Sequence, residues 1–202
     1  AIMFLISWVW AYFIRGHLGL PSIVNTVIGI IVLYGIGLAF FLFITKNVRN
    51  DSGLYYNLGI VYEKLRQFQN AAEAYRKAIA LSPNEMDAVY NLGLVNIELQ
   101  NYDEAIKCFE KVLKTDENDS NSYFNLGLAY FKKKDYPKAV KYFQNTIDLN
   151  DEDIYAHFYI GNIMKEVGEI QGAREQFNKV LEISPDYSWA YFNLGSIAYK
   201  KS

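Results

Sequence analysis

Few residues of the chain have the types and spacing that catalysis or metal binding requires. Its 202 residues include two histidines, His17 and His157, and one cysteine, Cys108. The histidines have no spacing that would place them on one metal ion or beside a nucleophile. Lys107 and Lys111 could lower the pKa of Cys108, but a lone cysteine cannot form an intrachain disulfide or supply a zinc site. We therefore expect no catalytic residue, no metal and no cofactor, and we interpret His157 and Cys108 as packing residues.

Two short segments have the composition, but not the order, of ligand-binding loops. Residues 151–153 read Asp-Glu-Asp, without the alternating oxygen ligands and central glycine of a calcium loop, and we interpret them as a solvated turn. Residues 35–37 read Gly-Ile-Gly, but they lie inside an apolar run and not between a strand and a helix. That position excludes a phosphate-binding loop.

Charge is distributed unevenly along the chain. It carries 20 basic and 22 acidic residues, and Arg15 is the only charged residue among the first 45. The part that follows is nearly balanced, with no long run of either sign. Because a nucleic-acid binder is expected to carry a basic stripe, this balance argues against nucleic acid as a partner.

The uncharged beginning of the chain has the length and composition of a membrane segment. Residues 23–45 are apolar, and as a helix they would extend about 34 Å, enough to cross a bilayer core of ~30 Å. Residues 1–14 are equally apolar but would extend only about 21 Å, as a truncated span would. With a connector between them, the sequence predicts a transmembrane helical hairpin over residues 1–45, and a linker over 46–51. Since the chain begins with Ala1 and not Met, we expect it to be part of a longer protein.

The flanking charges predict an orientation for this hairpin. Lys46 and Arg49 follow the second span directly, against Arg15 alone in the connector. Basic residues favour the cytoplasmic side of a membrane. We therefore expect a multi-pass integral membrane protein whose remaining residues lie in the cytoplasm.

The rest of the chain repeats with a period of 34 residues. Glycines mark the period at Gly59, Gly93, Gly127, Gly161 and Gly195. Twelve residues after the first four come Ala71, Ala105, Ala139 and Ala173, and four residues later Tyr75, Phe109, Phe143 and Phe177. A fixed period of this length is the signature of a solenoid of helix pairs.

The residue types in these columns resemble the tetratricopeptide repeat (TPR) family. The first repeat carries Tyr55-Tyr56-Asn57-Leu58-Gly59 with Tyr62, then Ala71, Tyr75, Ala78 and Pro83. The resemblance covers residues 52–202 and implies an all-α fold, a right-handed solenoid of four repeats and one further helix. The repeats are expected at 52–85, 86–119, 120–153 and 154–187, and the further helix at 188–200. We expect each glycine to face an alanine of the second helix, where the two axes cross.

The first helices of such repeats line a concave groove, which is the predicted functional site. Residues at i, i+4 and i+7 share one helix face. On that face the chain places apolar residues in the middle of the groove. The predicted binding residues are Tyr56, Tyr90, Leu94, Ile97, Phe124, Leu128, Phe131, Phe158 and Phe192, and the predicted polar rim is Glu63, Glu98, Lys132 and Lys165. Nearby asparagines, Asn57, Asn91, Asn125 and Asn193, could bind the backbone of an extended partner.

An exposed apolar groove of this size usually has a partner. We expect an apolar helix or extended segment, or subunits of a membrane complex, and we expect truncation of Phe124 and Phe131 to leave the fold intact. The alternative for the aromatics is that they merely tile the helix junctions. The chain is thus predicted to be a membrane-anchored TPR scaffold without catalytic activity. The alternative function is the carboxyl-terminal TPR region of a polytopic membrane glycosyltransferase or polysaccharide polymerase, since the resemblance extends to such enzymes.

Overall fold

The computed structural model of the chain describes residues 34–39 and 51–199. The chain divides into two compact units, residues 1–51 and 52–202. In the first unit, residues 34–39 form a helical segment with exposed side chains. The other residues of the predicted hairpin, and the linker before residue 51, lie outside the described residues, so the hairpin stays a prediction. Across the two described ranges, no helix has the length and apolarity needed to cross a membrane.

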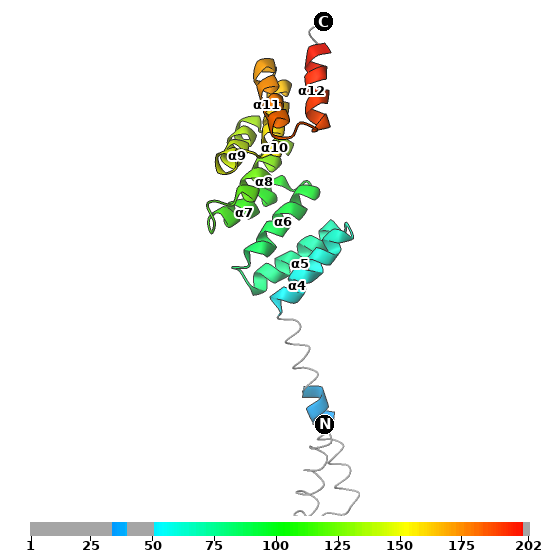
Figure 1. The fold of residues 1–202 in the computed structure, drawn as a ribbon. Helices are drawn as coiled ribbons and strands as arrows, with labels where there is room; N and C mark the ends of the chain where they lie inside the picture. Colours follow the sequence, from blue (N-terminus) through cyan, green and yellow to red (C-terminus); the bar gives the residue numbers. More distant parts are fainter. Residues whose placement is uncertain (1–33, 40–50, 200–202) are drawn as a thin grey trace, which may run out of the picture. The chain divides into compact units, whose positions relative to one another are not determined.

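The second unit consists of consecutive helix pairs followed by a single helix (Figure 1). Within a pair the first helix packs on the second, and each second helix packs on the first helix of the next pair. The all-α repeat architecture predicted from the 34-residue period is therefore confirmed. The helices are α4 (Ser52–Lys64), α5 (Phe68–Leu81), α6 (Met86–Glu98), α7 (Tyr102–Leu113), α8 (Ser120–Lys132), α9 (Tyr136–Leu149), α10 (Ile154–Glu166), α11 (Ile170–Ile183) and α12 (Ser188–Tyr199).

The four paired first helices end in the same tight turn. The second residue after the end of each helix has a left-handed backbone, with φ of 56°, 61°, 62° and 87° at Arg66, Gln100, Lys134 and Gly168. The next amide then reaches back to a carbonyl five residues earlier, as in Gln67 N to Tyr62 O at 2.8 Å. This hydrogen bond is the Schellman closure that ends a helix and satisfies its last carbonyls. Only the fourth turn uses glycine, so three turns hold a side chain in a conformation that costs about 1–2 kcal/mol.

Aspartates begin three of the helices. Side chains of Asp119, Asp135 and Asp153 accept hydrogen bonds from backbone N–H groups in the first turns of α8, α9 and α10. Such a cap satisfies an N–H group that has no partner within the helix and typically contributes ~1 kcal/mol. The acidic segment 151–153 therefore contains a helix cap, in agreement with its interpretation as a turn.

The repeated glycines make room for aromatic rings of the second helix. A Cβ added to Gly93, Gly127 or Gly161 would lie 2.7–2.8 Å from the ring of Phe109, Phe143 or Phe177, and Gly59 faces Tyr75 in the same way. The sequence predicts an alanine opposite each glycine, whereas the atoms nearest to an added Cβ belong to the aromatic ring four residues after that alanine. The alanine column instead lies in the core, with Ala71, Ala105, Ala139 and Ala173 fully buried.

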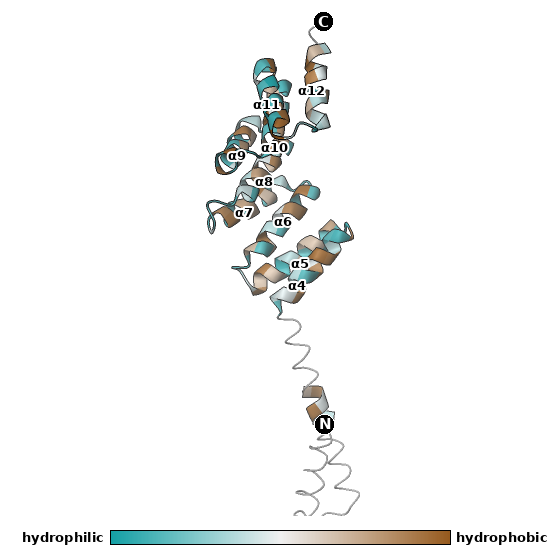
Figure 2. Cartoon of the chain, in the orientation of Figure 1, coloured by the Kyte–Doolittle hydropathy of each residue, from teal (hydrophilic) through white to brown (hydrophobic). Residues whose placement is uncertain are grey.

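Fully buried aromatic rings form the centre of each helix pair. Tyr75, Phe109, Phe143 and Phe177 have no exposed surface. Each buried ring removes roughly 150–250 Å² from water and is worth about 2–3 kcal/mol by that burial. Figure 2 shows the resulting pattern, with hydrophobic and hydrophilic faces on the same helices.

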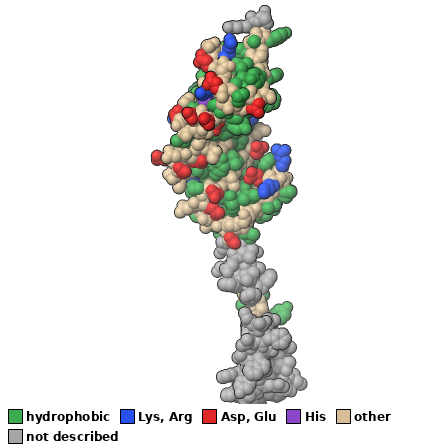
Figure 3. Space-filling model, viewed as in Figure 1, with side chains coloured by type: hydrophobic (Ala, Val, Ile, Leu, Met, Phe, Trp, Pro, Cys, Tyr) green, Lys and Arg blue, Asp and Glu red, His purple; other side chains and the backbone are tan. Residues whose placement is uncertain are grey.

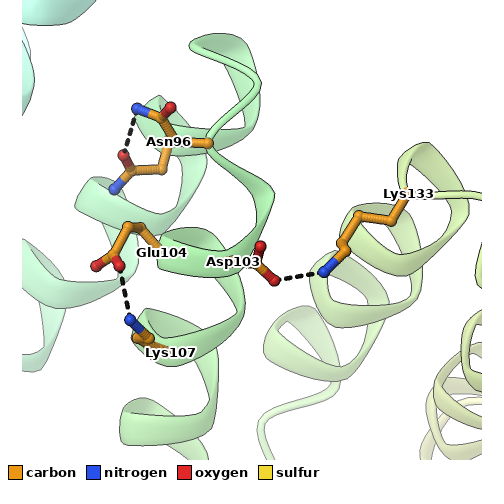
Figure 4. A network of polar contacts seen from close by, with 6 residues as sticks. Asn96, Asp103, Glu104, Lys107 and Lys133 are labelled. Atoms are coloured by element: carbon orange, nitrogen blue, oxygen red, sulfur yellow. Dashed lines mark hydrogen bonds and ion pairs between the residues drawn. The ribbon is translucent and has the colours of Figure 1, made fainter.

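Polar contacts on the second repeat lie mostly at its surface (Figure 4). Lys107 pairs with Glu104 at 2.7 Å, and Lys133 pairs with Asp103, joining the end of α8 to α7. This lysine lowers the pKa of Asp103 through a hydrogen bond and its charge. Since both pairs are largely exposed to solvent, they contribute little to stability. Buried Asn96 is different, because its amide donates to the carbonyl of Leu92 at 2.9 Å within α6.

Candidate partner-binding groove

All nine predicted binding residues lie on first helices, and eight of them are half-buried. The ninth, Phe192 on α12, is 66% exposed. The half-buried residues are Tyr56 on α4, Tyr90, Leu94 and Ile97 on α6, Phe124, Leu128 and Phe131 on α8, and Phe158 on α10. On the face in view in Figure 3, apolar side chains reach the surface between charged ones along the repeats.

Three of the predicted residues converge on one cavity. Leu94, Ile97 and Leu128 line a pocket of about 220 Å³ formed mainly by α4, α6 and α8. The other lining residues are Glu63, Phe68, Val95, Glu98 and Asn125. The pocket therefore combines an apolar wall with two carboxylates and one amide, the composition typical of a site that orients an apolar ligand with a few polar groups.

A second cavity, of about 370 Å³, lies where α6 begins and α7 ends. Tyr90 is its one residue from the predicted binding set. The others are Met86, Asp87, Val112, Thr115, Asp116, Asp119 and Asn121. Sequence reasoning missed this cavity because its residues come from two helix ends and a turn, which follow no single helical column. The cluster of aspartates around residues 116–119 was the available signal.

The groove asparagines bind neighbouring repeats. Asn91 donates from Nδ2 to the hydroxyl of Tyr56 at 3.3 Å, and Asn125 donates to the hydroxyl of Tyr90 at 2.9 Å. Asn125 also donates to the carbonyl of Asn121 at 2.9 Å. Amide N–H groups of Asn91 and Asn125 thus join one repeat to the next, and binding of an extended partner by these side chains stays a prediction.

The third and fourth junctions use different pairs. The ring of Phe124 lies 5.9 Å from that of Tyr159. Tyr159 occupies the repeat position that Asn91 and Asn125 hold in the second and third repeats. A phenylalanine offers no hydroxyl to an amide, so an aromatic partner suits this position better. At the next junction Lys165 donates to Oδ1 of Asn193.

Phe124 and Phe131 belong to both the groove and the core. The ring of Phe124 lies 5.5 Å from that of Phe143, and Phe131 packs edge-on against Tyr159 at 5.2 Å. Both residues pack against the buried cluster of the central repeats. These contacts hold α8 to α9 and α10, so we expect truncation of both residues to lower the stability of the repeats, in contrast to the expectation from the sequence that the fold is unaffected. These aromatics therefore pack partly between neighbouring helices, as in the alternative interpretation.

Phe158 packs in the same way at the following repeat. Its ring lies 5.9 Å from that of Phe177 and 5.4 Å from that of Tyr187. Phe192 contacts Trp189 on its own helix, at 6.1 Å, and Trp189 is 62% exposed. The most exposed aromatic surface of the predicted groove is thus on α12.

The two side-chain types that most often take part in catalysis or metal binding have structural roles in the repeats. Burial raises the pKa of Cys108 to about 11, and the nearby Arg76, Lys111 and Lys107 lower it by less. The thiol is therefore not an activated nucleophile. His157 is buried, with its ring nitrogens 2.8 Å from Oε1 of Gln176 and 3.2 Å from the carbonyl of Asp151. In the part of the chain that the structure describes, no cluster of His, Cys, Asp and Glu could hold a metal ion.

Stacked helix pairs of this kind define the class of α-solenoid repeat proteins. Three family models match parts of this solenoid. A model of the tetratricopeptide repeat matches residues 56–122, a TPR repeat model matches 161–202, and a model of anaphase-promoting complex, cyclosome, subunit 3, matches 98–180. A comparison with curated proteins gives no match.

Solved structures of TPR proteins have the same fold. The crystal structure of YrrB, described as a TPR protein with an unusual peptide-binding site, is 30% identical over 78% of this chain and 83% of that chain, with a TM-score of 0.61. MamA 41-end from Desulfovibrio magneticus RS-1 is 29% identical over 69% of this chain and 78% of that chain, with a TM-score of 0.66. A further MamA crystal structure is 25% identical, covers 74% and 82%, and has a TM-score of 0.68. The chain belongs to the tetratricopeptide repeat family.

Proposed function

We propose that the chain is a scaffold that binds a segment of a protein partner in the groove of its first helices. The cavity lined by Leu94, Ile97 and Leu128 carries this proposal. It is formed by side chains from separate repeats, so it exists only in the stacked solenoid. Its apolar wall would be covered by an apolar side chain of the partner, and such a buried centre usually carries most of the binding energy of an interface.

The similarity to YrrB supports a peptide-binding role, since YrrB is described as a TPR protein with an unusual peptide-binding site. The scaffold role also agrees with the chemistry of the described residues. Cys108 has a raised pKa, and His157 is held by hydrogen bonds inside the solenoid.

The uncharged residues 23–45 would anchor this scaffold in a membrane, with the repeats on the cytoplasmic side. The support comes from the length of the apolar run and from Lys46 and Arg49 directly after it. Carbonate washing of membranes would test the anchor. The full chain should stay in the pellet, and a variant lacking residues 23–45 should be released. Release of the full chain would contradict the anchor but not the binding groove.

The binding site can be tested by photocrosslinking in cells. A photoreactive amino acid replaces Ile97, whose side chain lines the cavity. Illumination should give a discrete crosslinked product. Leu94→Ala combined with Leu128→Ala should remove that product, because truncation at the centre of an interface costs about 2 kcal/mol or more, roughly a 30-fold loss of affinity.

A matched control separates lost binding from lost folding. Leu113 on α7 and Leu181 on α11 are also half-buried leucines, but they lie on second helices. Leu113→Ala with Leu181→Ala should leave the crosslinked product in place, and both double variants should keep the helical circular dichroism of the parent. Retention of the product by the groove variant would show that the cavity is not the binding site.

A further inference from the structure

The two cavities are neighbours on the first three repeats. Tyr90 lines the larger cavity and Asn125 the smaller one, and the two side chains are joined by the 2.9 Å hydrogen bond. Helix α6 contributes to both, with Asp87 and Tyr90 in one and Leu94 and Ile97 in the other. At 1.5 Å per residue these two pairs are centred about 10 Å apart along the helix axis.

The lining of both cavities is acidic. Five of their 16 residues, eight in each, are carboxylates, whereas the whole chain has 22 in 202. No lysine or arginine lines either cavity. The carboxylates are Asp87, Asp116 and Asp119 in the larger cavity, and Glu63 and Glu98 in the smaller one.

The nearby lysines are engaged elsewhere or lie outside the lining. Lys111 donates from Nζ to the carbonyl of Pro83 at 3.0 Å, and Lys133 pairs with Asp103. Lys132 is exposed at the end of α8. The acidic lining is therefore not neutralised by basic side chains within the cavities.

Three of the carboxylates are held in position by hydrogen bonds from the protein. Asp119 accepts from the amide of Asn121 at 3.2 Å and from the hydroxyl of Ser122 at 2.5 Å. Asp116 accepts from the amide of Asn118 at 3.0 Å. Glu63 accepts from the hydroxyl of Tyr75 at 2.8 Å. A carboxylate has about four acceptor sites, so each of these groups can accept further donors.

We infer that the partner segment in this groove is a stretch of another protein that is both basic and apolar. It inserts an apolar side chain between Leu94, Ile97 and Leu128, and a lysine or arginine into the neighbouring acidic cavity. This inference rests on the proposed function, because it names the chemical class of the partner at the same site. In a polyproline II conformation an extended chain has three residues per turn and rises about 3.1 Å per residue, so anchor side chains three residues apart lie on the same side, about 9 Å from each other.

Charge and apolar contact contribute differently to this recognition. The apolar side chain supplies most of the affinity, and the carboxylates select the sign of the partner and speed its association. Exposed ion pairs are weak individually and are screened by salt. Binding should therefore weaken as the salt concentration rises but should not disappear.

This inference can be tested by selecting, from a displayed library of random 12-residue peptides, those that bind the purified full chain in detergent. Peptides retained by the parent protein should be enriched in sequences with a lysine or arginine two to four positions from a leucine, isoleucine, valine or phenylalanine. Selected peptides, synthesised with a fluorescent label, then serve as probes for binding by fluorescence anisotropy. Asp87→Asn combined with Glu98→Gln should lower the affinity for these peptides at least about threefold at low salt.

Matched controls make the charge effect specific. Glu73 on α5 and Glu110 on α7 are exposed acidic residues of second helices. Glu73→Gln with Glu110→Gln changes the net charge equally and should leave the affinity unchanged. Leu94→Ala with Leu128→Ala should weaken the same probes more strongly than the charge variant.

The outcomes separate this inference from the proposed function. Probes that depend on Leu94 and Leu128 but are acidic or uncharged would overturn the inference and leave the binding groove standing. Equal weakening by both charge variants would also overturn it, because the effect would then be one of net charge. If no peptide is enriched, or if none depends on Leu94 and Leu128, both the inference and the proposed groove are wrong.

Discussion

The same substitution, glycine to alanine, should have opposite effects at two positions of one repeat column. Gly127 on α8 faces the ring of Phe143, and an added Cβ would lie 2.7 Å from two ring carbons. Gly195 occupies the corresponding place on α12, and an added Cβ there meets nothing within 4 Å. The pair therefore separates the local preference of a helix for alanine from the cost of filling occupied space.

At Gly127 the cost of crowding should exceed the gain in helix propensity. Ordinary carbon–carbon contact is ~3.5–4.0 Å, so the ring would have to retreat by about 0.8 Å or more. Phe143 has no exposed surface, and its ring is stacked on Tyr159 at a centroid distance of 5.3 Å. Overpacking costs about 1–3 kcal/mol, and alanine returns about 1 kcal/mol of helix propensity. We expect Gly127→Ala to destabilise the repeats by up to about 2 kcal/mol.

At Gly195 only the propensity gain remains, so Gly195→Ala should stabilise the protein by up to ~1 kcal/mol. Thermal unfolding of the full chain in detergent, followed by circular dichroism, should place the two midpoints up to about 12 °C apart. The parent protein should lie between them. If Gly127→Ala melts at or above the parent, the ring is free to move, and the close approach of Gly127 to Phe143 is not what the repeat requires.

Two further predictions concern the reactivity of Cys108 and the exposed face of α4. Because burial raises the pKa of Cys108 to about 11, its alkylation by iodoacetamide should accelerate about tenfold per pH unit between pH 7 and 10; a rate that levels off near pH 8 would contradict the burial of the thiol. Leu58 and Leu92 share a repeat column but are 37% and 8% exposed, so Leu92→Lys should destabilise the protein by about 3 kcal/mol or more in urea unfolding, and Leu58→Lys by less than ~1 kcal/mol. Equal destabilisation by the two substitutions would mean that the face of α4 that carries Leu58 is covered.

The 34-residue period predicts the fold well because each column repeats one physical requirement. Glycine, alanine and a large aromatic recur at fixed spacing, so the helix pairs and their stacking can be read from the sequence. The period does not reveal which columns touch, because the contact depends on how the two helices cross. Spacing alone therefore favours Ala139 and its equivalents as partners of the glycines, whereas the structure pairs the glycines with Phe143 and its equivalents.

The candidate site was predictable only in part, for two physical reasons. Half-buried residues such as Phe124 have one side in the groove and the other in the core, and a helical column does not distinguish these sides. The larger acidic cavity is formed by helix ends and a turn, and turns follow no period. The turns after the first helices were equally hidden, since Arg66, Gln100 and Lys134 adopt a conformation that glycine usually marks.

Repeats of similar sequence carry a risk during folding, because a helix pair could stack on the wrong neighbour. The junctions of this solenoid counteract that risk through their different side chains. Asn125 finds a hydroxyl on Tyr90, whereas Tyr159 finds the bare ring of Phe124. If the third repeat were skipped, Tyr159 would meet Tyr90, and Asn125 would lose its acceptor.

An order that stacks Asn91 on Phe124 would leave an amide without a hydroxyl acceptor, at a cost of about 1–3 kcal/mol for each buried amide without a partner. The junction between the second and third repeats pairs Tyr90 with Asn125, and the next junction pairs Phe124 with Tyr159. This difference favours the natural order of the third and fourth repeats. Shuffled versions of this chain, with the second and third repeats interchanged, should fold less cooperatively than the natural order, although every repeat in them is intact.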